Sequence, residues 1–472
     1  MKCAGPGEAK TLRGRFALSD EEKKLMAGTR DNKFTRRKFI ESAAALAAYG
    51  PFFKIPGRAL LQRRTLRIAH WSHFIPGYNR WFADTLAKEW GDKNDTNVSV
   101  DFIPAERIAA QASAEITAKA GHDLFVFPWP PAQYEEHAID HNQVYQQVSF
   151  KYGQIGLFTH KSTFNRKTKK YFAFMDSWIP APFEYFGDMW AEANMPIGPV
   201  HYGGLHSGGK RIREKTGIPC GLALGPTLEG NVTLHTLLLA FGGRLQDSSG
   251  DILLDRGATT TEVLKYIQAL CKDAGGPKQL NWGPSENVEA MLKRQSSCSI
   301  NAISLVRDAE AQDPKLASLI KLQPPLLGQS GIIAVPHVSN CSAIWNFAQN
   351  EKGAVKFLAD MIDSSKAIFE KSRGCNFPVY QKTLPDLVVR LENDATGQPP
   401  YKYKELKDAL HWTCNLGFPG FADAVAAEVF TSSLLPKMVM RVMVDNERPE
   451  DAVAAAGKEA NAIAKKWSSI TS

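Results

Sequence analysis

Aromatic side chains are concentrated in two short stretches, HWSHFIPGYNRW (His70–Trp81) and PWPP (Pro128–Pro131). The flat rings of Trp71, Phe74 and Trp129 could pack against the apolar face of a small ring-shaped solute. Three further tryptophans are weaker candidates for such a contact: Trp178, Trp282 and Trp345. Because a tryptophan is more often part of a core than of a binding surface, each of these rings could instead be buried packing.

The sequence patterns of common catalytic and cofactor sites are missing. There is no G-x-S-x-G, no dinucleotide-binding glycine fingerprint and no C-x-x-C or Cys/His cluster with zinc spacing. Apart from Cys3 near the start of the chain, the other six of the seven cysteines are spread widely, at Cys220, Cys271, Cys298, Cys341, Cys375 and Cys414. We therefore expect no catalytic residue, no metal and no cofactor. One or two disulfides are possible in an oxidising compartment, and their pairing is left open.

Two stretches imitate functional motifs. GLHSGGK (Gly204–Lys210) has the spacing of a phosphate-binding loop, but Arg211 stands where a Ser or Thr must bind magnesium. A glycine-rich surface loop is the better interpretation. Glu184 and Asp188 are four residues apart, as paired catalytic carboxylates on a helix could be. A solvated helix face explains that spacing equally well.

Charge is distributed unevenly along the chain. The net charge of +8 could indicate binding to nucleic acid. Residues 1–64, however, hold 15 of the 57 basic groups and 6 of the 49 acidic groups, which leaves 42 basic and 43 acidic groups in residues 65–472. The basic character therefore belongs to the first 64 residues, and we expect no nucleic-acid partner.

The sequence FTRRKFIESAAALAAYG (Phe34–Gly50) resembles a twin-arginine export signal, with Arg36 and Arg37 as the arginine pair. The weakly apolar run that follows is shorter and more polar than the roughly 20 apolar residues of a membrane-spanning helix. We expect residues 1–64 to be an export leader and linker. The alternative is a basic turn followed by an ordinary alanine-rich helix.

The remaining 408 residues exceed the size at which a single core stops growing, about 250–300 residues, so two lobes are expected. Strand-like and helix-like patterns alternate at the start of this region: Leu66–Trp71, Arg80–Trp90, Val98–Ile103, Ala105–Gly121 and Asp123–Phe127. This βαβαβ order predicts an α/β fold with a mostly parallel sheet covered by helices. In such sheets, ligands bind beyond the carboxyl ends of the strands, where the two aromatic stretches fall.

Ordered pieces along nearly all of residues 65–472 resemble the family 1 extracellular solute-binding proteins of ATP-binding-cassette (ABC) importers, which include maltose-binding protein. The pieces are AKAGHDLFVF, YFGDMWAEANMP, SGDILLDRGATTTEVLKYIQAL, NEKGAVKFLADMID and NFPVYQ. Two segments depart from the family pattern. HYGGLHSGGKRIREKTGIP lacks the usual Thr-Trp-x-Glu helix start, and SINAISLVR lacks the common Gly-Pro-Trp.

The resemblance implies a two-lobed, periplasmic-binding-protein-like (type II) fold with a ligand cleft between the lobes. Residues 65–175 and about 300–335 would form the first lobe, and about 176–299 and 336–472 the second with the C-terminal helices. We expect the chain to cross between lobes near Phe174–Pro180, Ile300–Val306 and Ile332–His337. The implied function is that of a periplasmic, non-enzymatic receptor that binds a sugar or polyol and delivers it to an ABC permease, after export by the twin-arginine (Tat) machinery.

Polar groups for the hydroxyls of such a solute would supplement the aromatic rings. The candidates are His70, Arg107, Asp176, Glu229, Asn231 and Asn301. With Trp71, Phe74, Trp129, Trp178 and Trp345 they form the predicted ligand site. Two other functions stay open: an exported redox enzyme or hydrolase, and a two-lobed signalling receptor without a transport role.

Overall fold

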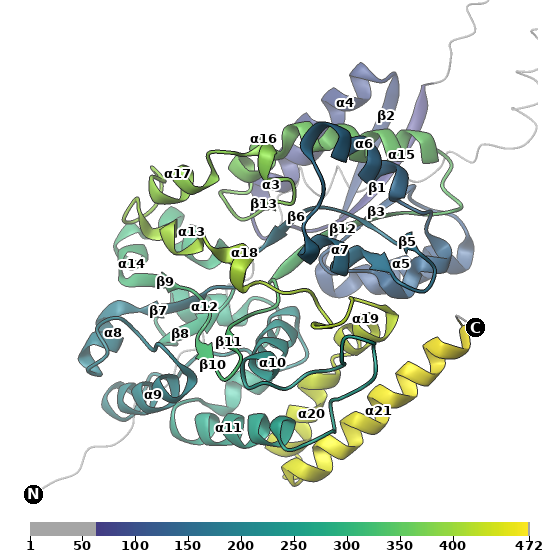
Figure 1. Ribbon diagram of the computed structural model, residues 1–472. Helices are drawn as coiled ribbons and strands as arrows, with labels where there is room; N and C mark the ends of the chain where they lie inside the picture. Colours follow the sequence, from purple (N-terminus) through teal and green to yellow (C-terminus); the bar gives the residue numbers. More distant parts are fainter. Residues whose placement is uncertain (1–62, 471–472) are drawn as a thin grey trace, which may run out of the picture. The chain divides into compact units, whose positions relative to one another are not determined.

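A computed structural model describes residues 63–470 (Figure 1). The predicted export signal, with Arg36 and Arg37, lies outside the described residues. No helix within residues 63–470 is long and apolar enough to cross a membrane.

The larger of two main sheets has six strands in the order β13-β6-β12-β3-β1-β2. Its strands are β1 (Arg64–Trp71), β2 (Thr96–Ile103), β3 (Leu124–Phe127), β6 (Phe174–Ile179), β12 (Val338–Ile344) and β13 (Phe377–Pro378). β1 pairs in parallel with β2 and β3, as the βαβαβ pattern predicts, whereas β12 is antiparallel to both β3 and β6. The sheet is therefore mixed, because β12 enters it from the other half of the fold.

Helices surround this sheet, and several of them contact its strands (Figure 1). They are α3 (Pro76–Trp81), η1 (Phe82–Ala87), α4 (Lys88–Lys93), α5 (Ala105–Ala118), η2 (Ala132–His137), α6 (Asn142–Tyr152), α7 (Leu157–Thr163), α15 (Glu351–Met361), η4 (Ile362–Ser364) and α16 (Ser365–Lys371). The predicted helix from Ala105 ends earlier than expected, because Lys119 adopts the left-handed conformation and closes it.

One carboxylate ties the first sheet together. Asp123 accepts hydrogen bonds from the backbone N–H groups of Arg67 (2.8 Å) and Asn350 (2.9 Å). Asn350 in turn caps α15, since its side-chain oxygen accepts from Gly353 N. Asp123 therefore links the beginning of β3 to β1 and α15.

The smaller main sheet has three strands in the order β8-β7-β9, all antiparallel, where we expected mostly parallel pairing. They are β7 (Phe183–Phe186), β8 (Cys298–Ile300) and β9 (Ile320–Gln323). The helices that follow or connect them are α8 (Gly187–Glu192), α9 (Tyr202–Thr216), α10 (Leu228–Ala240), α11 (Thr259–Asp273), η3 (Pro277–Leu280), α12 (Glu286–Leu292), α13 (Ser304–Gln312) and α14 (Pro314–Leu319). Two small hairpins complete the strands, β4–β5 (Phe164–Asn165, Lys170–Tyr171) and β10–β11 (Leu327–Gly328, Gly331–Ile332).

The chain passes between the two main sheets at two of the predicted places. β6 continues through residues 180–182 into β7, and residues 333–337 lead into β12. The expected third crossing, Ile300–Val306, instead leads from β8 into α13, which packs against α12 and α14. The chain passes between the two sheets once more after β13, because η6, which comes later in the chain, packs against β9. Residues 320–323 pair in the smaller sheet and residues 338–344 in the larger one, the reverse of the lobes expected for them, because a local sequence pattern does not show which strands will pair.

The C-terminal helices contact elements of both sheets. They are α17 (Leu387–Glu392), η6 (Lys402–Leu406), α18 (Ala409–Trp412), α19 (Ala424–Thr431), α20 (Leu434–Met443) and α21 (Pro449–Ile470), with the short turn η5 (Gln381–Thr383) before them. α19 packs against η2, whereas α20 and α21 pack against α10 and α11, as Figure 1 shows.

A buried ionic network fixes the segment after β13 to α13. Arg307 donates to Glu310 (3.0 Å), to the carbonyl of Arg373 (2.6 Å) and to Asp394, and its guanidinium lies 3.9 Å from the Tyr403 ring centre. The Tyr403 hydroxyl donates to the other oxygen of Glu310 at 2.9 Å. The Arg307 side chain is only 2% exposed, so its guanidinium group has lost its hydrogen bonds to water. Its charged partners replace those bonds.

The six cysteines of residues 63–470 are all buried and unpaired in this structure. Cys220 and Cys298 lie on neighbouring segments, because Gly221 N donates to the carbonyl of Cys298 at 3.1 Å.

Candidate functional site

A cavity of about 490 Å³ lies beyond the carboxyl ends of β1, β2 and β3. Ser72 and Phe74 follow β1, Pro104 follows β2, and Trp129 follows β3. The facing wall comes from the first turn of α10, the loop before α12 and the junction of α19 with α20. The cavity is therefore at the expected edge of the parallel strands, with the elements of the smaller sheet opposite.

Four helices begin at this cavity. The residues at the starts of α5, α10, α12 and α20 all line it. The first N–H groups of a helix have no partner within the helix, and the helix dipole makes this end positive. At α10, the Thr227 hydroxyl accepts from Gly230 N and caps one of these groups. The walls therefore present backbone donors to an oxygen-rich ligand.

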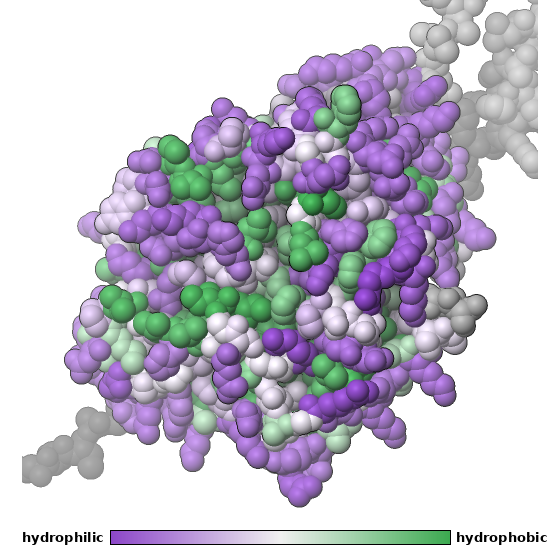
Figure 2. Space-filling model, in the orientation of Figure 1, coloured by the Kyte–Doolittle hydropathy of each residue, from purple (hydrophilic) through white to green (hydrophobic). Residues whose placement is uncertain are grey.

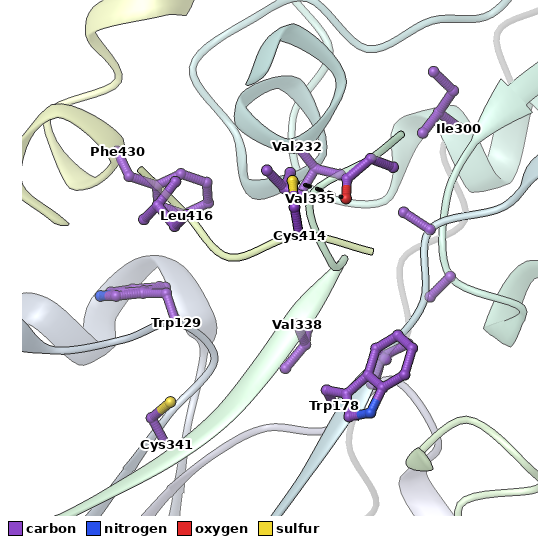
Figure 3. Close-up of a cluster of buried hydrophobic side chains, with 14 of the residues drawn as sticks. Trp129, Trp178, Val232, Ile300, Val335, Val338, Cys341, Cys414, Leu416 and Phe430 are labelled. Carbon is purple, nitrogen blue, oxygen red and sulfur yellow. Dashed lines mark hydrogen bonds between the residues drawn. The ribbon is translucent and has the colours of Figure 1, made fainter. Parts of the chain in front are cut away.

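Aromatic rings form one part of the wall. Trp129 is 8% exposed, and its ring centre lies 6.2 Å from that of Phe430 on α19. Figure 3 shows these two rings on the same side of β12. The indole Nε1 of Trp129 is buried and has no hydrogen-bond partner among the described residues. Because a buried donor without a partner is costly, a ligand acceptor at this point would stabilise the site.

Asn231 also lines this cavity and has an unpaired acceptor. Its Nδ2 donates to the Thr227 carbonyl (3.0 Å) and to the Ser433 hydroxyl (3.1 Å), which fixes the amide orientation. Its Oδ1 is buried and finds no partner within the described part of the chain. Two residues that line the cavity therefore carry an unmatched group, a donor on Trp129 and an acceptor on Asn231. A hydroxyl group can satisfy either of them.

The charged residues at the cavity are acidic. Glu229 is 5% exposed, and burial raises the pKa of its carboxyl group. Glu106 lines the outer part at the start of α5 and is exposed. Among the described residues that line the cavity, none is Lys, Arg or His. This arrangement suits a neutral ligand whose hydroxyl groups donate to the carboxylates, and it disfavours an anion.

Two lining residues, Ser285 and Ser433, have left-handed backbone conformations, with φ of 66° and 55°. They immediately precede α12 and α20. Non-glycine residues in this region store a small strain, which tends to occur at binding sites.

The cavity brings together four of the predicted ligand residues: Phe74, Trp129, Glu229 and Asn231. The other seven lie elsewhere. Arg107 is on the exposed face of α5, and its side chain does not line the cavity.

Trp71 is a core residue. It ends the predicted strand Leu66–Trp71, and β1 includes it and pairs it with Ile103. Its indole Nε1 donates to Asn340 Oδ1 at 2.7 Å inside the sheet. Trp345 is also fully buried, with its ring 5.5 Å from that of Phe125.

The remaining polar candidates are buried away from the cavity. His70 lies between the sheet and η1, and burial lowers its pKa to about 4. Asp176 accepts from the Ser177 hydroxyl at 2.6 Å, and burial raises its pKa to about 6. Asn301 accepts from Ala302 N at 2.7 Å. Trp178 lines a different cavity, described below.

Several lining residues were not predicted from the sequence, namely Ser72, Glu106, Thr227, Ser285, Phe430 and Ser433. Thr227 could have been found, because T-L-E-G has the form of a helix start. Nothing in the local sequence around Phe430 or Ser433 indicates that α19 and α20 join at the cavity.

Solved structures share this arrangement across most of the chain. A solute-binding protein of an ABC transporter from Thermotoga lettingae TMO, bound with α-D-tagatose, matches at 17% identity and a TM-score of 0.70, covering 85% of this chain and 99% of that one. The maltose-bound MalE3 of T. maritima matches at 16% identity and a TM-score of 0.69, covering 84% and 99%. A solute-binding protein from Agrobacterium radiobacter K84 in complex with ribitol matches at 17% identity and a TM-score of 0.64, covering 85% and 98%.

The fold is that of the two-lobed periplasmic solute-binding proteins. No protein-family model and no curated protein sequence matches the chain. The cavity beyond β1, β2 and β3 is lined both by loops that follow strands of the larger sheet and by helices that connect strands of the smaller one.

Proposed function

We propose that the protein is the substrate-binding receptor of an ABC importer and that it binds a neutral sugar or polyol in the cleft. The observation that carries this proposal is the cavity itself. It combines an aromatic face at Trp129, a buried unpaired donor and acceptor, two carboxylates and the beginnings of four helices. Flat C–H faces pack on aromatic rings, and hydroxyl groups satisfy mixed donors and acceptors.

The ligands of similar structures support this class of solute. The three structures described above hold α-D-tagatose, maltose and ribitol, which are all neutral and polyhydroxylated. In this chain, the absence of Lys, Arg and His among the described lining residues favours the same chemistry over an organic anion.

Binding would work by closure of two lobes. In our proposal, the six-stranded sheet with its helices forms one lobe and the three-stranded sheet with α8 to α14 forms the other. A solute that contacts Trp129 on one side and Asn231 on the other binds the closed form more tightly, and so increases its population. The closed form then docks on a membrane permease. No covalent step is needed, and we propose that the protein is not an enzyme.

A thermal-shift panel tests the proposed function. The full chain would be heated with monosaccharides, disaccharides, pentitols, polyamines and aromatic acids. We expect a neutral sugar or polyol to raise the melting temperature by a few degrees, since ligand at 100 times its Kd adds about 2.7 kcal/mol to the free energy of unfolding. If no sugar or polyol shifts the melting temperature and a redox or hydrolase substrate is turned over, the receptor proposal is wrong.

Delivery to the periplasm through the twin-arginine pathway is part of the proposal. It rests on the sequence around Arg36 and Arg37. Residues 1–64 fused to a reporter should direct its export, and changing both arginines to lysine should abolish it. Continued export of the Lys–Lys variant by the folded-protein pathway would contradict this route.

A further inference from the structure

A second, larger cavity of about 650 Å³ lies on the other side of β12 from the cleft. One wall comes from β6, β13 and the segment between α6 and α7, and the opposite wall from η6, α18 and residues 413–418. Figure 3 shows Trp129 and Trp178, one from each cavity, on opposite sides of the strand that carries Val338. The proposed sugar site and this cavity are therefore separate spaces.

The inner wall of this cavity is aromatic. The Trp178 ring lies 5.4 Å from the rings of both Phe158 and Phe377. Phe418 faces them from the opposite wall. The outer part is also apolar, since Leu157 and Leu410 line it and are 68% and 41% exposed. Figure 2 shows apolar surface over α17 and between α7 and α18 on this face. An opening of this kind fits a flat apolar group.

The charge of the lining is opposite to that of the cleft. Lys161, Lys382 and Lys407 line the cavity, and among the described lining residues there is no Asp, Glu or His. Lys161 Nζ donates to the Pro419 carbonyl at 2.7 Å, whereas Lys382 and Lys407 are exposed. The nearby carboxylate of Asp408 is paired with His411 at 3.6 Å.

A polar group inside the cavity also has no partner. The Thr413 hydroxyl is buried and makes no hydrogen bond to any residue between 63 and 470. Thr413 is 7% exposed and is one of the residues that line the cavity. A ligand oxygen would satisfy this group, which an entirely apolar ligand would not do.

We propose that this cavity is a second binding site, for a small organic anion with a flat apolar body, such as an aromatic carboxylate. The ring would lie against Trp178, Phe158 and Phe377. The acid group would face Lys382 and Lys407. The same chain would then bind a neutral polyhydroxylated solute on one side of β12 and an amphipathic anion on the other.

Calorimetric titration of the full chain with 2-naphthoate tests this proposal. We expect one binding site, with binding at least about fivefold weaker for 2-naphthalenemethanol and for 2-naphthylmethylammonium, because two exposed ion pairs together contribute about 1 kcal/mol. The double variant Lys382→Gln/Lys407→Gln should likewise bind 2-naphthoate at least about fivefold more weakly than the wild type does. Lys437→Gln/Lys458→Gln, which removes equal charge from exposed positions outside the cavity, should bind like the wild type.

Two further variants separate the sites. Gly156→Phe should block 2-naphthoate, since Gly156 lines the cavity and a Cβ there meets nothing within 4 Å, so the variant should fold. Glu229→Gln alters the cleft and should leave 2-naphthoate affinity unchanged. Equal affinity for the three naphthyl probes, no binding of 2-naphthoate, or loss of binding in Glu229→Gln would each overturn the proposal.

Discussion

At the scale of single residues, the site depends on groups that the folded chain leaves unsatisfied. Trp129 Nε1 and Asn231 Oδ1 are buried at one cavity without a partner among the described residues. Trp71 shows the contrast, because its Nε1 already donates to Asn340 and its ring is enclosed by the core. The N–H of Trp71 is already used within the fold, whereas that of Trp129, a residue that lines the cavity, has no partner among the described residues.

Replacing Trp129 tests its role. In Trp129→Ala, the affinity for the stabilising sugar should fall at least tenfold, about 1.4 kcal/mol, because both the stacking face and the indole donor are lost. Leu410→Ser, at the mouth of the second cavity, is the control and should bind the sugar as the wild type does. Equilibrium titration measures both. Unchanged affinity in Trp129→Ala would remove this side chain from the site.

A buried histidine should make stability depend on pH. Burial lowers the pKa of His235, on α10, to about 4 from an ordinary value of 6.5. Between these two pH values the unfolded chain binds a proton that the folded chain excludes, so stability falls as the pH decreases from 6.5 to 4. His235→Gln cannot titrate. As the pH falls from 6.5 to 4, the free energy of unfolding should therefore decrease less in His235→Gln than in the wild type. The difference between the two decreases should be up to roughly 3 kcal/mol.

Denaturant unfolding at several pH values measures this difference. His411→Gln, which changes an exposed imidazole, should follow the wild-type curve. Parallel curves for the wild type and His235→Gln would show that His235 can be protonated in the folded protein.

At the scale of elements, local patterns predicted strands and helices but not their partners. The alternation of Val98–Ile103 and the apolar run Leu124–Phe127 correspond to β2 and β3. Residues 338–344 are buried throughout, so their sequence has no alternation that selects one face or one neighbour. The pairing of β12 with β3 and β6 is set by long-range contacts, which is why the expected lobe assignment of this region was reversed.

The Arg307 network should be essential for joining α13 to the segment after β13. Arg307→Met leaves Asp394 without its cation and Glu310 with only the longer ionic contact to Arg373 at 3.8 Å, and removing one partner of a buried ion pair costs about 3–5 kcal/mol. Lys88→Met breaks an exposed pair with Asp92 and should cost less than about 1 kcal/mol. Chemical denaturation compares the two. Similar small losses for both variants would contradict the structural role of the network.

At the scale of the whole molecule, the sequence was sufficient for the fold class, whereas the ligand site stays a prediction. The order of family-like pieces indicated two α/β lobes, and the solved structures share that fold. Four of the predicted ligand residues, Phe74, Trp129, Glu229 and Asn231, line one cavity, and Trp129 was chosen because it follows a predicted strand end. Phe430 and Ser433 reach the cavity because α19 packs against η2 and α20 against α10, contacts between residues some 200–300 positions apart in sequence.

A crystal structure of the full chain with the sugar or polyol that most raises its melting temperature is the most direct test of the proposed function. We predict that the solute lies between Trp129 and Asn231, with its oxygens within hydrogen-bonding distance of Trp129 Nε1 and Asn231 Oδ1. A solute bound outside this cavity, or a cleft that stays empty while the solute stabilises the protein, would contradict our account.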